Sequence, residues 1–181
     1  MTTANKLTIL RVILVPVFMA FLLINQVWSQ IAALIIFAAA SATDAIDGYI
    51  ARHYNQITTF GKFMDPLADK MLTTAAFLVL LEHGRVSCIA VMIVLAREFI
   101  VSGVRMLAVA DGKVIAASML GKIKTVSQMI AIMAAIILMN NAFSEQPAML
   151  ITNILVWIST AITVISGIDY IVKNRYIFKD R

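Results

Sequence analysis

Four aspartates form two close pairs in an otherwise apolar part of the chain. Asp44 and Asp47 are three residues apart, and Asp65 and Asp69 are four apart. Residues with these spacings lie on one face of a helix, so each pair would present two carboxylates side by side. Four carboxylates around a small volume suit a hard divalent cation such as Mg²⁺ or Mn²⁺, without which they repel one another. The stretch from Asp44 to Asp69 therefore predicts a metal site between two helix faces.

The composition indicates that the helices lie in a membrane. The 181 residues are 61% hydrophobic, with a mean hydropathy of +0.92. A single domain of this length cannot hide so much apolar surface in its own core, so we assign residues 1–181 to one membrane domain. The lone Cys88 excludes a disulfide framework and a cysteine-based metal site. The net charge of +5 comes from basic residues that flank apolar segments, which favours contact with membrane lipids over nucleic acid.

The apolar segments predict an all-α bundle of six transmembrane helices. A short polar segment at the N-terminus is expected to lie at the membrane interface, as is the basic end of the chain from Asp169. Pro66 disfavours a helical conformation at Asp65, so the third helix either starts there or is locally distorted. That helix is expected to end near residue 81, and the others to cover about residues 7–24, 31–51, 86–110, 116–139 and 148–168.

The basic residues predict how the bundle is oriented. Six spans place both termini on the same side of the membrane, and fourteen of the fifteen lysines and arginines then fall on that side. By the positive-inside rule, both termini are cytoplasmic. The uncharged part of the fifth helix, from Thr125 to Met139, is roughly 22 Å long, whereas a bilayer core is about 30 Å thick. The charged helix ends are therefore expected to line a wet cavity open to the cytoplasm.

The aspartates belong to a longer pattern with eight fixed positions over 26 residues. It begins at Asp44 and reads D-x2-D-G-x2-A-R-x8-G-x3-D-x3-D. This pattern resembles the signature of the CDP-alcohol phosphatidyltransferase family, with which every position agrees. The resemblance implies a six-helix membrane enzyme, usually a homodimer. Such an enzyme transfers a phosphoalcohol group from a cytidine diphosphate donor to an acceptor hydroxyl and releases CMP.

The resemblance also implies roles for single residues. Asp44, Asp47 and Asp65 are expected to bind two divalent cations, Mg²⁺ or Mn²⁺, and Asp69 to be both a ligand and the base that accepts the proton of the attacking hydroxyl. The donor, CDP-diacylglycerol, is expected to lie against small residues that leave room for a nucleotide. Arg52 offers a planar fork to one of its phosphates. The expected donor-binding residues are Asn5, Thr8, Gly48, Ala51, Arg52, Thr58 and Gly61.

A second group of charges lies in the other half of the chain. It consists of Arg97, Arg105, Lys122 and Lys124. Uncompensated cations at membrane depth are unfavourable unless an anion binds among them, so we interpret these four as the site for the phosphate of glycerol 3-phosphate. The segments AREFIVSGVR and GKIKT resemble family members that use this acceptor. Because Arg97 and Glu98 are neighbours on a helix and point apart, an ion pair between them is not expected.

Two other interpretations stay open on the sequence alone. The same chemistry can use another acceptor alcohol, such as serine, choline or inositol phosphate. Intramembrane carboxylates also occur in cation and proton transporters. A transporter needs charges that continue across the midplane, whereas the outer half of every predicted helix lacks them. Lys62 and Lys70 are interpreted as snorkelling side chains. The favoured interpretation is a multi-pass enzyme of the cytoplasmic membrane with its active site facing the cytoplasm.

Overall fold

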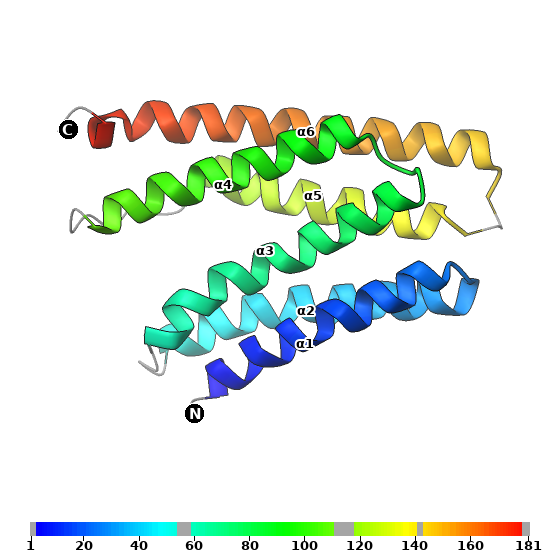
Figure 1. Ribbon diagram of the computed structural model, residues 1–181, viewed down its shortest axis with the longest axis horizontal. Coiled ribbons are helices and arrows are strands. Elements are labelled where there is room, and N and C mark those ends of the chain that lie inside the picture. Colours follow the sequence, from blue (N-terminus) through cyan, green and yellow to red (C-terminus); the bar gives the residue numbers. More distant parts are fainter. Residues whose placement is uncertain (1–2, 54–58, 111–117, 141–142, 179–181) are drawn as a thin grey trace.

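A computed structural model shows an all-α bundle (Figure 1). It describes residues 3–53, 59–110, 118–140 and 143–178, and among these the side chains other than those of 3–7, 44–53, 59–66, 69 and 110. Six α-helices and one short 3-10 helix make up the described part. They are α1 (Thr3–Ile24), α2 (Val27–His53), α3 (Thr59–Glu82), α4 (Cys88–Ala110), α5 (Met119–Leu138), α6 (Glu145–Lys173) and the 3-10 helix η1 (Arg175–Phe178).

The helices are longer at several ends than the sequence predicts. The polar residues from Thr3 onward belong to α1, which continues to Ile24, so they are not a segment separate from the first helix; their place at the membrane interface stays a prediction. The α6 helix likewise runs on to Lys173, into the tail that was expected to be interfacial. Its last turn holds an ion pair between Lys173 and Asp169, with Nζ and Oδ1 2.8 Å apart. Four-residue spacing makes such a pair possible only because the backbone there is helical.

Pro66 lies inside a helix rather than at its start. The α3 helix begins at Thr59 and continues through Asp65 and Pro66 to Glu82. Of the two alternatives for this proline, a helix start at Pro66 is therefore wrong. Neighbouring helices of a bundle can satisfy the backbone groups that a proline leaves without an intrahelical bond.

All six helices run along the long axis of the molecule, and both termini lie at the same end (Figure 1). The opposite end holds short turns. Asn25 between α1 and α2 has a φ of 54°, and Gly84 between α3 and α4 has a φ of 65°. Asn and Gly are the residues that enter this left-handed region most readily, so both turns can reverse the chain within a few residues. The charged helix ends are thereby gathered at the end where the termini lie.

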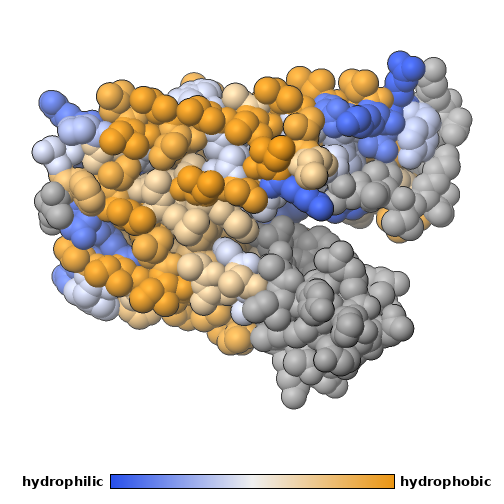
Figure 2. Space-filling view, turned by 180° about the vertical axis from the view of Figure 1, so that it is seen from behind, coloured by the Kyte–Doolittle hydropathy of each residue, from blue (hydrophilic) through white to orange (hydrophobic). Residues whose placement is uncertain are grey.

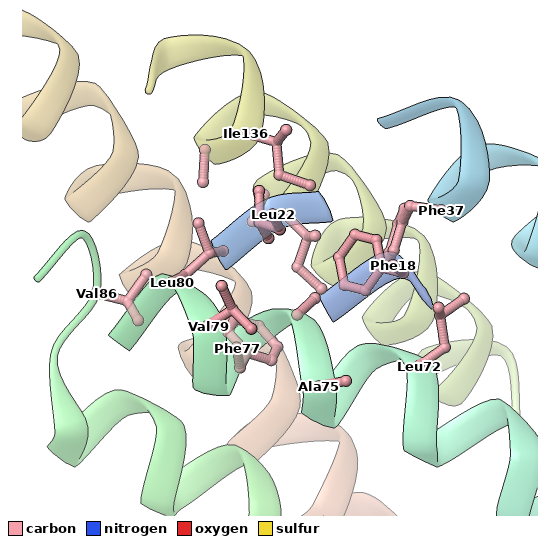
Figure 3. Packing of buried hydrophobic residues seen from close by; sticks show 14 of the residues in the cluster. Phe18, Leu22, Phe37, Leu72, Ala75, Phe77, Val79, Leu80, Val86 and Ile136 are labelled. Atoms are coloured by element: carbon pink, nitrogen blue, oxygen red, sulfur yellow. The ribbon is translucent and has the colours of Figure 1, made fainter. Parts of the chain in front are cut away.

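The main core lies where α1, α2 and α3 meet the other helices (Figure 3). Phe18 of α1 and Phe37 of α2 are fully buried, and their ring centroids are 5.6 Å apart. A smaller cluster, which includes Val101, Val104 and Tyr170, joins α4 to α6. The most extensive helix contacts are those of α5 with α6 and of α1 with α2 and α3. The molecule thus consists of two three-helix halves, with α3 contacting α4 and α5 across the boundary.

Apolar side chains cover much of the outer surface, and hydrophilic residues gather at both ends of the bundle (Figure 2). Large exposed residues on one helix include Met92, Phe99 and Met106 of α4, each at least 65% exposed. Among the described residues, α5 and α6 are long and apolar enough to cross a membrane, and the apolar parts of α1 and α2, Thr8–Ile24 and Val27–Thr43, are shorter. Such a surface belongs in lipid rather than in water.

Candidate active site

The aspartate motif lies on two helices that contact each other. Asp44 and Asp47 are in α2, and Asp65 and Asp69 are in α3. Since both segments are helical, the three- and four-residue spacings place each pair on one helix face, as predicted. The α1 helix packs against both α2 and α3. The side chains of all four aspartates lie outside the described residues, so their metal-binding roles stay predictions.

Of the predicted donor-binding residues, only Thr8 has a described side chain. Thr8 of α1 is fully buried, on the face that continues with Arg11 and Val15 into the core. The other predicted donor contacts lie outside the described side chains; they are Asn5, Gly48, Ala51, Arg52, Thr58 and Gly61. For these residues the structure gives at most a place on a helix, with Thr58 outside the described backbone as well.

A polar cavity of about 490 Å³ lies between the two halves of the bundle. Side chains of α2, α3, α4, α5 and α6 line it. The charged lining residues are Lys70, Arg97, Glu98, Arg105, Lys122 and Lys124. All four residues predicted to hold an acceptor phosphate are in this set, so the structure brings them together as expected. Glu98 is the single acid among the described lining residues.

The cavity charges differ greatly in their exposure. Lys124 is buried, whereas Arg105 and Lys122 are exposed. The side chains of Arg97 and Glu98 expose only 11% and 13% of their surface. The cavity therefore has a nearly dry inner wall and a solvated outer rim, both of them basic.

The prediction that Arg97 and Glu98 do not pair is wrong. Nη1 of Arg97 donates to Oε1 of Glu98 at 3.2 Å. The Glu98 carboxylate also forms a salt bridge with Nζ of Lys124 on α5. Helical geometry directs the two neighbours apart at Cβ, but both side chains are long enough to turn into the same cavity, where Lys124 draws the carboxylate in. As a result, the charges of Lys124 and Arg97 are partly compensated by Glu98.

Hydroxyl groups extend this network to α3. Oγ of Ser102 donates to the backbone oxygen of Glu98 at 2.6 Å. Nζ of Lys70 donates to the same Ser102 hydroxyl oxygen. Lys70 therefore faces the cavity and is held there, which goes beyond the snorkelling role expected for it. Because Lys70 immediately follows Asp69, this bond connects the cavity to the helix that carries the second aspartate pair.

Three buried polar atoms at the cavity have no hydrogen-bond partner in the described part of the chain. They are Oγ of Ser41, Nε of Arg97 and the hydroxyl oxygen of Tyr170. Buried polar atoms are normally paired, because an unpaired one forfeits its hydration without replacement. All three atoms belong to residues that line this one cavity. Ser41 is three residues before Asp44 on the same helix.

Charge patterns in the sequence could find the cations but not the hydroxyl groups of this site. Ser41 and Ser102 lie in apolar stretches, where a hydroxyl residue is usually satisfied by its own helix backbone, and Tyr170 lies in the charged end of the chain after Asp169. A usable signal exists only for Ser102, which is one helical turn after Glu98. Among the residues whose side chains are described, no group of three His, Cys, Asp or Glu gathers at one point to bind a metal.

The chain belongs to the CDP-alcohol phosphatidyltransferase family, whose model matches residues 1–165. It is 39% identical over 182 residues to the CDP-diacylglycerol–glycerol-3-phosphate 3-phosphatidyltransferase of Bacillus subtilis (strain 168), covering 94% of this chain and 93% of the relative. A Rickettsia typhi protein (strain ATCC VR-144 / Wilmington) of the same name is 37% identical over 166 residues, with 92% and 93% covered. The Escherichia coli (strain K12) protein of that name is 41% identical over 130 residues, with 70% and 71% covered. Family membership confirms the enzyme interpretation over the transporter.

Proposed function

We propose that this chain transfers the phosphatidyl group of CDP-diacylglycerol to glycerol 3-phosphate, giving phosphatidylglycerol phosphate and CMP. The names of the three relatives carry these two substrates. The structural observation that supports the acceptor most directly is the cavity, where five basic side chains and one carboxylate line the described wall. Cations in a sparsely hydrated site favour an anionic ligand, and a neutral or zwitterionic alcohol would leave them uncompensated.

The shape of the lining suits a phosphate monoester. The fork of an arginine can donate two hydrogen bonds to phosphate oxygens, and lysine adds a compact charge. The first turn of α5 also borders the cavity through Ser118 and Gly121. Ser118 caps this helix by accepting from the backbone N–H of Gly121 at 3.0 Å. The partial positive charge of a helix N-terminus adds to the attraction for an anion.

The cavity borders the aspartate motif on both of its helices. Ser41 of α2 and Lys70 of α3 line it, and they lie three residues before Asp44 and one residue after Asp69. A glycerol 3-phosphate whose phosphate is held by the α4 and α5 cations would therefore direct its free hydroxyl toward the motif. This arrangement supports a shared site for the acceptor hydroxyl and the donor diphosphate.

In the proposed reaction, Asp69 accepts the proton of the acceptor hydroxyl. The hydroxyl oxygen forms a bond with the phosphorus that bears diacylglycerol, and the bond from that phosphorus to the CMP oxygen breaks. Arg52 and the small residues Gly48, Ala51 and Gly61 would hold the cytidine diphosphate part of the donor. Asn5 and Thr8, of which Thr8 is buried on α1, would contact the same part of the donor.

The donor set of the motif fits hard divalent cations. Four carboxylates on two contacting helices offer only oxygen ligands, which Mg²⁺ and Mn²⁺ prefer. When bound by Asp44, Asp47, Asp65 and Asp69, two such cations would neutralise the diphosphate and the charge on departing CMP. Asp69 would then serve as both ligand and base.

We further propose six membrane spans with both termini and the cavity on the cytoplasmic side of the cytoplasmic membrane. The positions of the termini and of the cavity cations at one end of the bundle support this orientation (Figure 1). The homodimer expected from the family stays a prediction.

Release of CMP from CDP-diacylglycerol in detergent micelles tests the proposed function. The purified protein is assayed with Mg²⁺ and with glycerol 3-phosphate, glycerol, serine or inositol phosphate as acceptor. Efficient CMP release only with glycerol 3-phosphate supports the proposal. Equal use of glycerol or serine would show that the basic cavity does not select a phosphate, and the acceptor assignment would be wrong.

A further inference from the structure

Arg97 crosses from α4 to α6 and is tied to both helices. Nη2 donates to Oγ of Ser166 on α6 at 2.8 Å, while Nη1 donates to Oε1 of Glu98 on its own helix at 3.2 Å. Nε has no hydrogen-bond partner in the described part of the chain. Two of the three guanidinium nitrogens therefore donate to the protein, the third is buried beside Gly167, and the side chain as a whole helps to line the cavity.

A glycine on α6 makes this crossing possible. A Cβ atom at Gly167 would lie 2.9 Å from Cγ and 3.6 Å from Nε of Arg97. The first distance is shorter than real Cβ contacts, so any side chain at position 167 would push the stem of Arg97 away from its present path. The contrast with Gly103 of α4 is informative, since a Cβ there would meet nothing within 4 Å. Gly167 is thus matched to the side chain that lies across it.

We propose that Ser166 and Gly167 form a notch on α6 that positions Arg97 to receive the phosphate of the acceptor. Gly167 gives the stem of Arg97 its path, and Ser166 fixes the end of the guanidinium. This inference rests on the proposed function, because it concerns the same acceptor phosphate. Ser166 and Gly167 are positioning residues, since they act through Arg97 rather than on the substrate.

The physical advantage of the notch is preorganisation. An arginine on a flexible stem loses rotamer freedom when it binds a ligand, and a stem already fixed has less to lose. Fixing it also holds the guanidinium at the cavity wall, and a misplacement of about 1 Å can weaken a productive contact greatly. The notch should therefore affect acceptor binding strongly and donor binding little.

The experiment compares Gly167→Ala and Ser166→Ala with Gly103→Ala as the matched control. KM values for glycerol 3-phosphate and for CDP-diacylglycerol are measured separately, with Tm as a check of folding. We expect Gly167→Ala to raise the KM for glycerol 3-phosphate about tenfold, with the donor KM unchanged. Ser166→Ala should act in the same direction, and Ser166→Thr, which keeps the hydroxyl, should recover part of the loss. Gly103→Ala should leave both KM values as they are.

A double-mutant cycle with Arg97→Ala separates positioning from general packing. Affinity for glycerol 3-phosphate is also measured by calorimetry, so that the cycle does not depend on turnover. If the notch acts through Arg97, Gly167→Ala should have no further effect once Arg97 is alanine. An equal effect in both backgrounds, or none in either, would overturn the positioning role. If Arg97→Ala itself leaves acceptor affinity unchanged, the proposed phosphate contact of Arg97 is wrong as well. If Arg97→Ala lowers acceptor affinity but neither Gly167→Ala nor Ser166→Ala does, only the positioning role of the notch is refuted.

Discussion

Replacing Lys124 by methionine tests the charged wall of the cavity most sharply. The Lys124 side chain is only 8% exposed and its ammonium forms a salt bridge with Glu98. Methionine keeps most of the length and apolar volume of the stem and removes the charge. Two consequences follow, one for the binding of the acceptor and one for the stability of the fold, and they can be measured separately.

The expected loss of acceptor affinity comes from one charge-assisted contact. Such a contact contributes about 1.5–3 kcal/mol, which corresponds to a roughly ten- to hundred-fold rise in the KM for glycerol 3-phosphate. The stability effect arises because Glu98 loses a partner. Removing one partner of a fully buried pair costs about 3–5 kcal/mol. Glu98 is 13% exposed and keeps Arg97 at 3.2 Å, so a smaller loss of roughly 1–3 kcal/mol is expected.

The assay measures KM values for both substrates together with Tm in the same detergent. Combining Lys124→Met with Glu98→Gln removes the stranded charge, so Tm should recover while the acceptor KM stays high. Lys173→Met is the matched control, because Lys173 is 64% exposed and pairs with Asp169 outside the cavity lining. A surface pair contributes about 0–1 kcal/mol, so this change should alter neither quantity appreciably. An unchanged acceptor KM in Lys124→Met, or an equal rise in the donor KM, would refute the reasoning.

Three further outcomes are expected. Asp44→Ala and Asp65→Ala should each abolish CMP release. Chelation should inactivate the unaltered enzyme reversibly, with Mg²⁺ or Mn²⁺ but not Ca²⁺ restoring turnover. Full activity in excess chelator would contradict the metal proposal. Asp69→Asn keeps the size and one oxygen but removes the base, so kcat should collapse while donor binding, measured by calorimetry, largely survives; near-normal turnover would exclude Asp69 as proton acceptor. Tyr170→Phe removes a buried hydroxyl that has no hydrogen-bond partner in the described structure, so Tm should hold or rise while the KM for the acceptor increases. A fall in Tm with an unchanged KM would show that the hydroxyl contributes to stability rather than to acceptor binding.

The parts of the fold that follow from single-helix patterns could be predicted from the sequence. Hydropathy gives the six helices, and the spacing of Asp44 with Asp47 and of Asp65 with Asp69 gives two helix faces. The gathering of the four cations around one cavity also follows, because charges in an apolar bundle avoid lipid and turn inward. Helix ends were less accurate, since a polar segment such as residues 3–6 can continue a helix that its neighbours support.

The parts that depend on contacts between helices could not be predicted. Whether Arg97 and Glu98 meet depends on Lys124, a residue of another helix that draws the carboxylate toward it. The close approach of the Arg97 side chain to Gly167 depends on the register of α4 against α6, and the hydrophobic periodicity of a single helix does not determine that register. Hydroxyl groups such as that of Tyr170 carry no charge pattern that would separate a cavity residue from a packed one.

The size of the cavity also bears on side reactions. At about 30 Å³ for each molecule of liquid water, a space of about 490 Å³ can hold on the order of ten waters before an acceptor enters. Water has a hydroxyl group that can attack the same phosphorus, so hydrolysis of CDP-diacylglycerol to phosphatidic acid and CMP competes with transfer. The basic wall favours transfer, because it can hold an alcohol through its phosphate and has no such hold on water. Phosphatidic acid should therefore accumulate slowly when the enzyme is given its donor alone.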